Sequence, residues 1–258
     1  MPCLYSNYYS KCHLAKSWHF LFRIFRLMEL TNAFKGTFIT APGVIQEKFA
    51  QIKAFVFDWD GVFNDGFKDA DGNSHFSEVD SMGTNLLRLN YYLRHHALPP
   101  VAVISGERNK AALSFAQREH IDAIYCGIKY KAEALEHLQH RWGILPHEVA
   151  FFFDDVLDFS IAKVCGLRFM IGRSANPLLI DFAIRNELVD YVTANDGGHG
   201  AIREASEMLM QLSGLYDETL THRMMFTGLY QEYFGKRNAG DTTLFLSRDG
   251  VISPAESL

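Results

Sequence analysis

The stretch KAFVFDWDGVF at residues 53–63 constrains the fold of this chain most, because an apolar run stops there at two closely spaced carboxylates. A continuous apolar run is typical of a parallel strand that is covered on both faces. In open α/β sheets, ligands bind beyond the carboxyl ends of such strands. Side chains along a strand alternate between its two sides, so Asp58 and Asp60 are predicted to face the same crevice. Gly61 then allows a sharp turn.

Two carboxylates this close repel each other unless a cation lies between them or one of them is protonated. A magnesium site that also holds a nucleophile and a proton donor meets both conditions. The alternative interpretation of Asp58 and Asp60 is an acidic turn after a buried strand.

The rest of the chain alternates short apolar strands with amphipathic helices, which predicts an α/β fold with a doubly wound, Rossmann-like parallel sheet. A turn signal at residues 71–73 between Phe67 and Phe76 predicts a projecting β-hairpin. Further strands are predicted at residues 101–104, 121–126, 149–153, 167–171 and 190–192. Helices are predicted at residues 86–96, 109–119, 131–142, 161–165 and 201–213.

Composition changes along the chain suggest three parts: an N-terminal extension at residues 1–50, partly helical or disordered, a main domain at 51–215, and a C-terminal helix with a flexible tail at 216–258. Residues 1–28 contain no Asp or Glu and are rich in aromatic and basic side chains. They are interpreted either as a basic amphipathic helix lying on a membrane or as a leader before a natural start at Met28. Stable membrane insertion is not expected, because the apolar run is short and interrupted by arginines.

Overall composition excludes several classes of function. The formal net charge of −5 provides no electrostatic footprint for nucleic acid. The four cysteines are far apart and form no CxxC pair, so a zinc site is not expected. The cysteines are expected to be reduced thiols in a cytoplasmic protein.

Three of the predicted strands end in polar residues, and the carboxyl ends of parallel strands meet at one edge of a sheet. These residues, together with a lysine that opens an intervening helix, are Asp58, Asp60, Ser105, Lys131, Asp154 and Asp155. Their order and spacing resemble the haloacid dehalogenase superfamily of phosphotransferases. By that resemblance, Asp58 attacks phosphorus, Asp60 transfers protons, and Ser105 and Lys131 bind the phosphoryl group.

The same resemblance implies a Mg²⁺ cofactor held by Asp58, Asp60 and Asp154. Asp155 and Asp158 are then expected to orient waters or basic neighbours around the metal, although Asp158 alone also fits a helix N-cap. Phe153 stands where the superfamily pattern has glycine, so the loop that carries Asp154 is expected to have a different backbone angle.

Residues 52–215 resemble one subfamily more closely, the phosphatases that act on phosphorylated keto-deoxy sugar acids of eight or nine carbons. The motifs that carry this resemblance are DGVFNDG at 60–66, DSMG at 80–83, Lys131 and GGHGAIRE at 197–204. The resemblance implies a small-molecule sugar acid phosphate as substrate, no large cap domain, and a homotetramer whose hairpins and neighbouring subunits close the site.

Two segments, Ser105-Gly106-Glu107 and Asp80-Ser81-Met82-Gly83, resemble the branch that acts on nonulosonate 9-phosphates, of the sialic acid type, more than the 3-deoxy-manno-octulosonate 8-phosphate branch. Glu107 is interpreted either as a ligand for sugar hydroxyls or as an exposed acid at a helix start. His199 and Arg203 are interpreted either as residues that reach a neighbouring subunit's site or the substrate carboxylate, or as a surface helix start. The predicted substrate-binding residues are Asp60, Asp80, Ser81, Gly106, Glu107 and Arg203.

Two alternatives remain. One is a 3-deoxy-manno-octulosonate 8-phosphate phosphatase, and the other is a weakly active oligomerisation module associated with a nucleotide-sugar synthetase. An inactive module would be expected to lose Asp58, Asp60 or Lys131, and the chain keeps all three.

Overall fold

The computed structural model describes residues 32–248 and 250–258. The two interpretations of residues 1–28 therefore concern a segment outside the described residues. Residues 36–258 form one compact unit. In the described part of the chain, every helix is too short or too polar to cross a bilayer.

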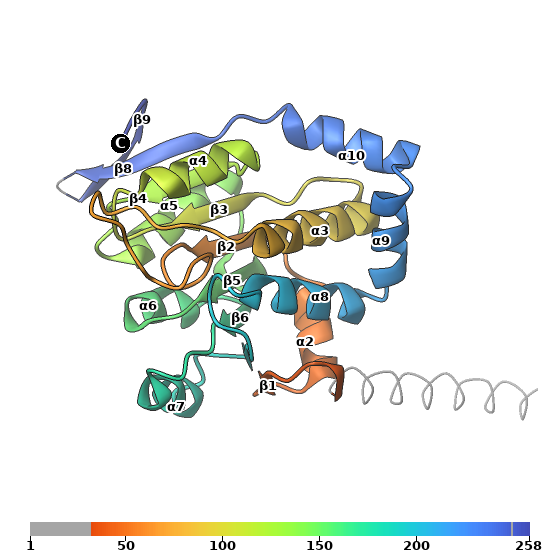
Figure 1. Cartoon of the computed structure of the whole chain (residues 1–258), viewed down its shortest axis with the longest axis horizontal. Helices are drawn as coiled ribbons and strands as arrows, with labels where there is room; N and C mark the ends of the chain where they lie inside the picture. The colour runs from red at the N-terminus through yellow and green to blue at the C-terminus, as the bar shows by residue number, and fades with distance from the viewer. Residues whose placement is uncertain (1–31, 249) are drawn as a thin grey trace, which may run out of the picture. The chain divides into compact units, whose positions relative to one another are not determined.

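The described strands form a single sheet in the order β1-β7-β6-β5-β2-β3-β4-β8-β9 (Figure 1). β2 lies between β3 and β5, and all neighbouring pairs are parallel except β1 with β7 and β8 with β9. The predicted parallel α/β sheet is confirmed. The strands are β1 (Thr37–Phe38), β2 (Ala54–Asp58), β3 (Val101–Ile104), β4 (Ala123–Cys126), β5 (Val149–Phe153), β6 (Leu167–Met170), β7 (Tyr191–Val192), β8 (Thr243–Arg248) and β9 (Val251–Ala255).

Helices cover both faces of the sheet. α5, α6 and α7 pack on one face, while α3 and α8 lie side by side over the other with α2 (Figure 1). α7 had no counterpart in the predicted pattern. The helices are α2 (Pro42–Phe49), α3 (Glu78–His95), α4 (Lys110–Arg118), α5 (Lys131–Trp142), α6 (Phe159–Ala162), α7 (Pro177–Arg185), α8 (Ala201–Ser213), α9 (Tyr216–Met224) and α10 (Gly228–Asn238), with short 3₁₀ helices at Pro146–Glu148 and Val156–Asp158.

The central strand β2 is buried along its whole length and divides its side chains between two cores. Val56 joins the core beneath α5. On the other face, Phe57 stacks on Phe152 with ring centroids 4.5 Å apart, and Phe55 meets Tyr91 of α3 edge-on. Each such fully buried side chain stabilises the fold by roughly 1.5–3 kcal/mol. The carboxyl end of β2 is therefore held rigidly from both sides.

The predicted β-hairpin does not form, because the described residues 66–77 contain no strand. A turn replaces it, in which the carboxylate of Asp69 accepts hydrogen bonds from the backbone N–H groups of Asp71 and Asn73. Asp69 N–H donates to the carbonyl oxygen of Asn73. Side-chain hydrogen bonds to the backbone thus take the place of a strand ladder.

The C-terminal part of the chain also differs from its prediction. The single helix expected from Tyr216 is divided into α9 and α10 at Phe226, whose φ is 47°. The tail predicted to be flexible forms β8 and β9, because β8 pairs in parallel with the edge of β4 and buries Leu244, Phe245 and Leu246. The apolar segment at residues 244–246 is short, and it forms a strand because the edge of β4 is open for pairing.

Candidate active site

Asp58, the last residue of β2, lies at the centre of the candidate site. Lys131, the first residue of α5, places its Nζ 2.5 Å from Oδ1 of Asp58 and 2.5 Å from Oδ1 of Asp158. The side chains of all three residues are less than a tenth exposed. Lys131 therefore holds two buried carboxylates together through charge-assisted hydrogen bonds.

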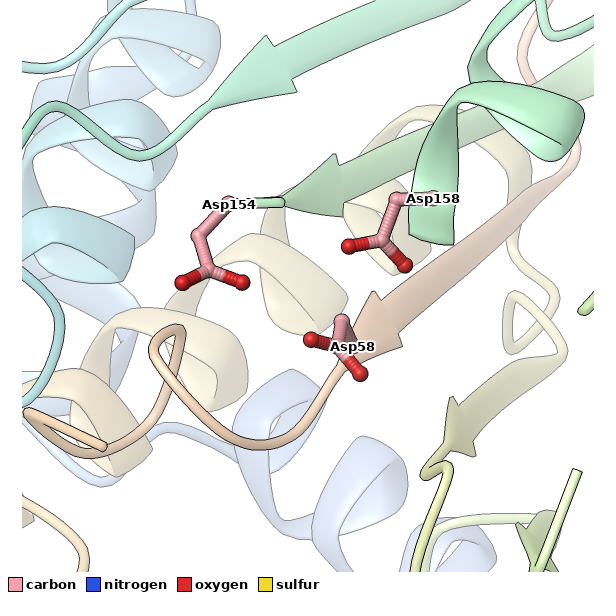
Figure 2. Close-up of side chains that lie close together, drawn as sticks. All are labelled: Asp58, Asp154 and Asp158. Atoms are coloured by element: carbon pink, nitrogen blue, oxygen red, sulfur yellow. The ribbon is translucent and has the colours of Figure 1, made fainter. Parts of the chain in front are cut away.

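Asp154, which directly follows β5, completes a cluster of three acids (Figure 2). One oxygen from each of Asp58, Asp154 and Asp158 lies within 4.8 Å of the others. Figure 2 shows the three carboxyl groups pointing toward a common space from the ends of neighbouring strands and from the 3₁₀ turn that follows β5.

The cluster is electrostatically strained. Burial, followed by repulsion from Asp158, raises the pKa of Asp58 well above its ordinary value and that of Asp154 to about 7. Burial also raises the pKa of Asp158. Burial lowers the pKa of Lys131, but the adjacent carboxylates of Asp58 and Asp158 outweigh this effect and raise it above its ordinary value.

A second cation, Arg173, partly balances the cluster by placing Nη2 3.0 Å from Oδ2 of Asp154. Three carboxylates against Lys131 and Arg173 leave an excess of negative charge in a buried space. Hard oxygen ligands with excess negative charge are what Mg²⁺ prefers. The residues present therefore fit a divalent magnesium ion.

The carboxylate of Asp60 points away from this cluster, toward the loop at residues 66–77. Its Oδ2 lies 3.0 Å from Nζ of Lys68, and its Oδ1 accepts a hydrogen bond from Oγ of Ser74 at 3.1 Å. Asp58 and Asp60 line the same cavity, as the sequence predicted, but the side chain of Asp60 is not part of the acid cluster.

A cavity of about 350 Å³ opens above the cluster. The predicted acids that line it are Asp58, Asp60, Asp154, Asp155 and Asp158. Gly106, Glu107 and Lys131 line it as well. At its rim, the exposed Glu107 forms a 3.0 Å ion pair with Lys129.

Gly61 permits the close approach of the loop after β2 to the acid cluster. Its φ is 83°, and a Cβ at this position would lie 1.9 Å from Oδ2 of Asp154. No other residue type fits both the backbone angle and the space. The glycine of the DxDG motif thus brings the two acidic loops together.

No family model matches the chain. The chain is 30% identical over 176 residues to the 3-deoxy-D-manno-octulosonate 8-phosphate phosphatase KdsC of Escherichia coli BL21, covering 67% of this chain and 87% of that protein. The chain belongs to the KdsC family of haloacid dehalogenase superfamily phosphatases.

Solved structures of KdsC-family phosphatases share the fold. The 3-deoxy-D-manno-octulosonate 8-phosphate phosphatase of Moraxella catarrhalis, in complex with magnesium, phosphate and KDO, has a TM-score of 0.56 and 25% identity over 69% of this chain and 96% of its own. The cobalt-bound enzyme of Haemophilus influenzae has a TM-score of 0.55 and 27% identity over 66% and 93%. The family that the sequence motifs predicted is confirmed.

Three predicted substrate-binding residues lie outside the cavity and have structural contacts. Asp80 is fully buried and accepts hydrogen bonds from the N–H groups of Gly200 and Arg203, so it caps the start of α8. Ser81 donates to Glu119, and the side chain of Arg203 pairs with Glu207 one turn along the same helix. The DSMG motif of this KdsC-family chain thus joins α3 to α8.

Local hydrogen bonds and ring packing hold the remaining predicted residues. Ser105 is fully buried at the end of β3, and its Oγ accepts a hydrogen bond from the N–H of Glu107. The carboxylate of Asp155 accepts from the N–H of Val156, while that of Asp158 accepts from the N–H of Asp155 as well as from Lys131. Phe153 continues β5 and stacks on Phe151, and neither it nor the following aspartate has a positive φ.

Sequence reasoning did not single out Arg173, Lys129, Ser74 or Asn109. Arg173 follows β6 at the same carboxyl edge as the other site residues, so the rule that found those residues would also have found Arg173. Asn109 was recognisable as the residue before a helix, since it is the N-cap of α4. Ser74 carries no local signal, because only the folded loop brings it to Asp60.

Proposed function

We propose that this chain is a Mg²⁺-dependent phosphatase that hydrolyses the phosphate monoester of a keto-deoxy sugar acid through a phosphoaspartate. The observation that carries the proposal is the buried Asp58, held by Lys131 at the floor of a cavity in a chain of the KdsC family. A carboxylate placed beside a cation, at the end of a central strand, has the arrangement needed of a nucleophile toward phosphorus.

In the proposed reaction, the free Oδ2 of Asp58 attacks phosphorus while Oδ1 stays bound to Lys131. A bond forms between phosphorus and Asp58, the bond to the sugar oxygen breaks, and Asp60 gives a proton to that oxygen. Water then attacks phosphorus, the bond between phosphorus and Asp58 breaks, and phosphate is released. Asp60 takes a proton from the attacking water, which restores both residues. Lys131 and the backbone around Gly106 stabilise the charge on the phosphoryl oxygens.

Asp58, Asp154 and Asp158 are the side chains that would hold magnesium, with Asp155 beside them at the cavity wall. When bound, the ion supplies positive charge that offsets the phosphoryl oxygens as the acid approaches. Asp60 was predicted as a further ligand, but its carboxylate is engaged by Lys68 and Ser74. The structure of the Moraxella catarrhalis enzyme with magnesium and phosphate supports the assignment of the metal.

For the substrate we favour a nonulosonate 9-phosphate. The support is the Ser105-Gly106-Glu107 segment, which places an acceptor, Glu107, at the rim of the cavity, where sugar hydroxyls would lie. Its pairing with Lys129 adds a cation suited to the substrate carboxylate. The second candidate is 3-deoxy-D-manno-octulosonate 8-phosphate, which the names of the similar proteins favour.

We also propose that the active form is a homotetramer. Large apolar side chains are exposed beside the cavity: Phe67 is 79%, Leu157 61% and Tyr130 60% exposed. A neighbouring copy that covers them would also shield the phosphoaspartate from bulk water. Light scattering at assay concentrations is expected to report a tetramer, and a fully active monomer would contradict this.

The decisive experiment measures phosphate release from both sugar acid phosphates and from a neutral hexose phosphate, with and without Mg²⁺. We expect Mg²⁺-dependent release from at least one sugar acid phosphate and little from the hexose phosphate. Asp58→Asn, which keeps the side-chain volume, is the control and is expected to be folded but inactive. Activity retained in Asp58→Asn would rule out the nucleophile, and absence of release from every substrate would favour an oligomerisation module.

A further inference from the structure

Ser74 lies in the loop at residues 66–77, outside the acid cluster, and its hydroxyl is surrounded by hydrogen-bond donors. Nδ2 of Asn109 lies 2.7 Å from Oγ of Ser74, Nε1 of Trp59 2.9 Å, and Nδ2 of Asn64 3.3 Å. We call Trp59, Asn64, Ser74 and Asn109 the Ser74 cluster. All four residues are at most 3% exposed, so water does not compete for these bonds.

The donor roles in the Ser74 cluster follow from chemistry and from the other contacts of each side chain. An indole Nε1–H donates only. Oδ1 of Asn109 accepts from the N–H groups of Ala111 and Ala112, which leaves its Nδ2 facing Ser74. Oδ1 of Asn64 likewise accepts from the backbone, at Gly61 and Gly66.

A hydroxyl has one hydrogen and two lone pairs. The two short donors, Nδ2 of Asn109 and Nε1 of Trp59, occupy the two lone pairs of Ser74 Oγ, while the longer contact from Asn64 Nδ2 is shared with the carbonyl oxygen of Trp59. The hydrogen of Ser74 therefore points to the remaining acceptor, which is Oδ1 of Asp60 at 3.1 Å.

Oδ1 of Asp60 is thereby fixed as an acceptor inside the protein. Oδ2, on the other side of the carboxyl group, pairs with Nζ of Lys68 at 3.0 Å, and the side chain of Lys68 is 32% exposed. Oδ2 is the oxygen that exchanges a proton with the reacting oxygen once Lys68 turns toward solvent.

We propose that Ser74 is a positioning residue that fixes the carboxyl plane of Asp60, so that Oδ2 delivers the proton to the leaving sugar oxygen. The proposal rests on the proposed phosphatase reaction. The four residues of the Ser74 cluster come from the end of β2, the turn after it, the loop at 66–77 and the start of α4. The cluster therefore ties three loops to one carboxyl group, although Ser74 does not touch the substrate.

The role predicts a dependence on the leaving group. A sugar alkoxide needs a proton as its bond to phosphorus breaks, whereas p-nitrophenolate leaves without one. General acid catalysis contributes about 10²–10⁴-fold, and a misplaced group loses much of this. In Ser74→Ala we expect kcat/KM to fall about 10- to 100-fold for the sugar acid phosphate and less than about threefold for p-nitrophenyl phosphate.

Three further variants separate positioning from folding. Ser74→Thr keeps the hydroxyl and is expected to recover most of the loss. Asn109→Asp keeps the N-cap of α4 but replaces a donor by an acceptor, so the hydrogen of Ser74 can turn from Asp60 to the new carboxylate. As in Ser74→Ala, we then expect kcat/KM to fall more for the sugar acid phosphate than for p-nitrophenyl phosphate. Ser77→Ala removes a hydroxyl that caps α3 in the same segment and is expected to show no such dependence.

Equal losses for both substrates in Ser74→Ala, or no loss for either, would overturn the proposal. A crystal structure of Ser74→Ala gives a readout that does not depend on activity, and in it we expect the Asp60 carboxyl group to be rotated or disordered. An unchanged Asp60 would refute the positioning role. If the parent protein hydrolyses neither substrate, the proposed function fails, while the crystal structure still decides whether Ser74 orients Asp60.

Discussion

Replacing Asp154 by asparagine is expected to stabilise the metal-free protein at alkaline pH. Burial and the charge of Asp158 raise the pKa of Asp154 from its ordinary 3.8 to about 7. For an acid whose pKa is raised by folding, the contribution to stability is full below the unfolded-state pKa. It is lost as the pH rises through the folded-state pKa. The metal-free parent should therefore lose stability between about pH 4 and pH 8.

The magnitude follows from the size of the shift. A rise from 3.8 to about 7, at about 1.4 kcal/mol per pKa unit, corresponds to a penalty on the order of 4 kcal/mol once Asp154 is ionised. Loss of the ion pair with Arg173, which is 28% exposed, offsets part of the gain in the variant. Since 1 kcal/mol shifts the Tm of a domain of this size by about 2–4 °C, Asp154→Asn should melt several degrees higher than the parent at pH 8.

Scanning calorimetry in EDTA at pH 5 and pH 8 measures this difference, which should be small at pH 5. Added Mg²⁺ should then raise the Tm of the parent more than that of Asp154→Asn, because the variant has lost one charged ligand. Asp181→Asn, the same change at a residue whose side chain is 58% exposed, is the control. A variant no more stable than the parent at pH 8, or a difference independent of pH, would refute the reasoning.

Three other changes test separate parts of the structure. Lys131→Met leaves two buried carboxylates unpaired, so at pH 8 without metal its free energy of unfolding should fall by on the order of 3–5 kcal/mol. Urea denaturation measures this, and an unchanged midpoint would contradict the buried ion pairs of Lys131 with Asp58 and Asp158. Arg173→Ala removes the cation that pairs with Asp154, so calorimetric titration should show Mg²⁺ binding that is severalfold tighter, while assays should show a higher KM for substrate. Weaker Mg²⁺ binding would show that the arginine does not compete with the metal. Deleting residues 243–258 removes the buried side chains of β8 and should lower the free energy of unfolding by about 5 kcal/mol or more, and a Tm within two degrees of the full chain, by circular dichroism, would contradict a structural role.

Several features could be predicted from the sequence because their causes are local. Buried strands form at the three apolar runs that precede Asp58, Ser105 and Asp154, as predicted. The helices α5 and α8 have the predicted bounds because their apolar positions recur at helical spacing. Parallel strands present their carboxyl ends at one edge, so the sequence alone indicated that these polar residues meet. The same rule would have included Arg173.

Tertiary packing decided the rest. Asp80 and Arg203 belong to motifs that looked like substrate contacts, but α3 and α8 approach so closely that a Cβ on Gly83 would lie 2.8 Å from Cα of Arg203, and Asp80 caps α8. The tail became β8 because β4 offers an open edge, a feature that no local pattern encodes. Sequence periodicity reports which face of an element is apolar, whereas the partner of each polar side chain depends on which elements meet. The contact between Ser74 and Asp60 is of this second kind, since it depends on the path of a loop that has no regular structure.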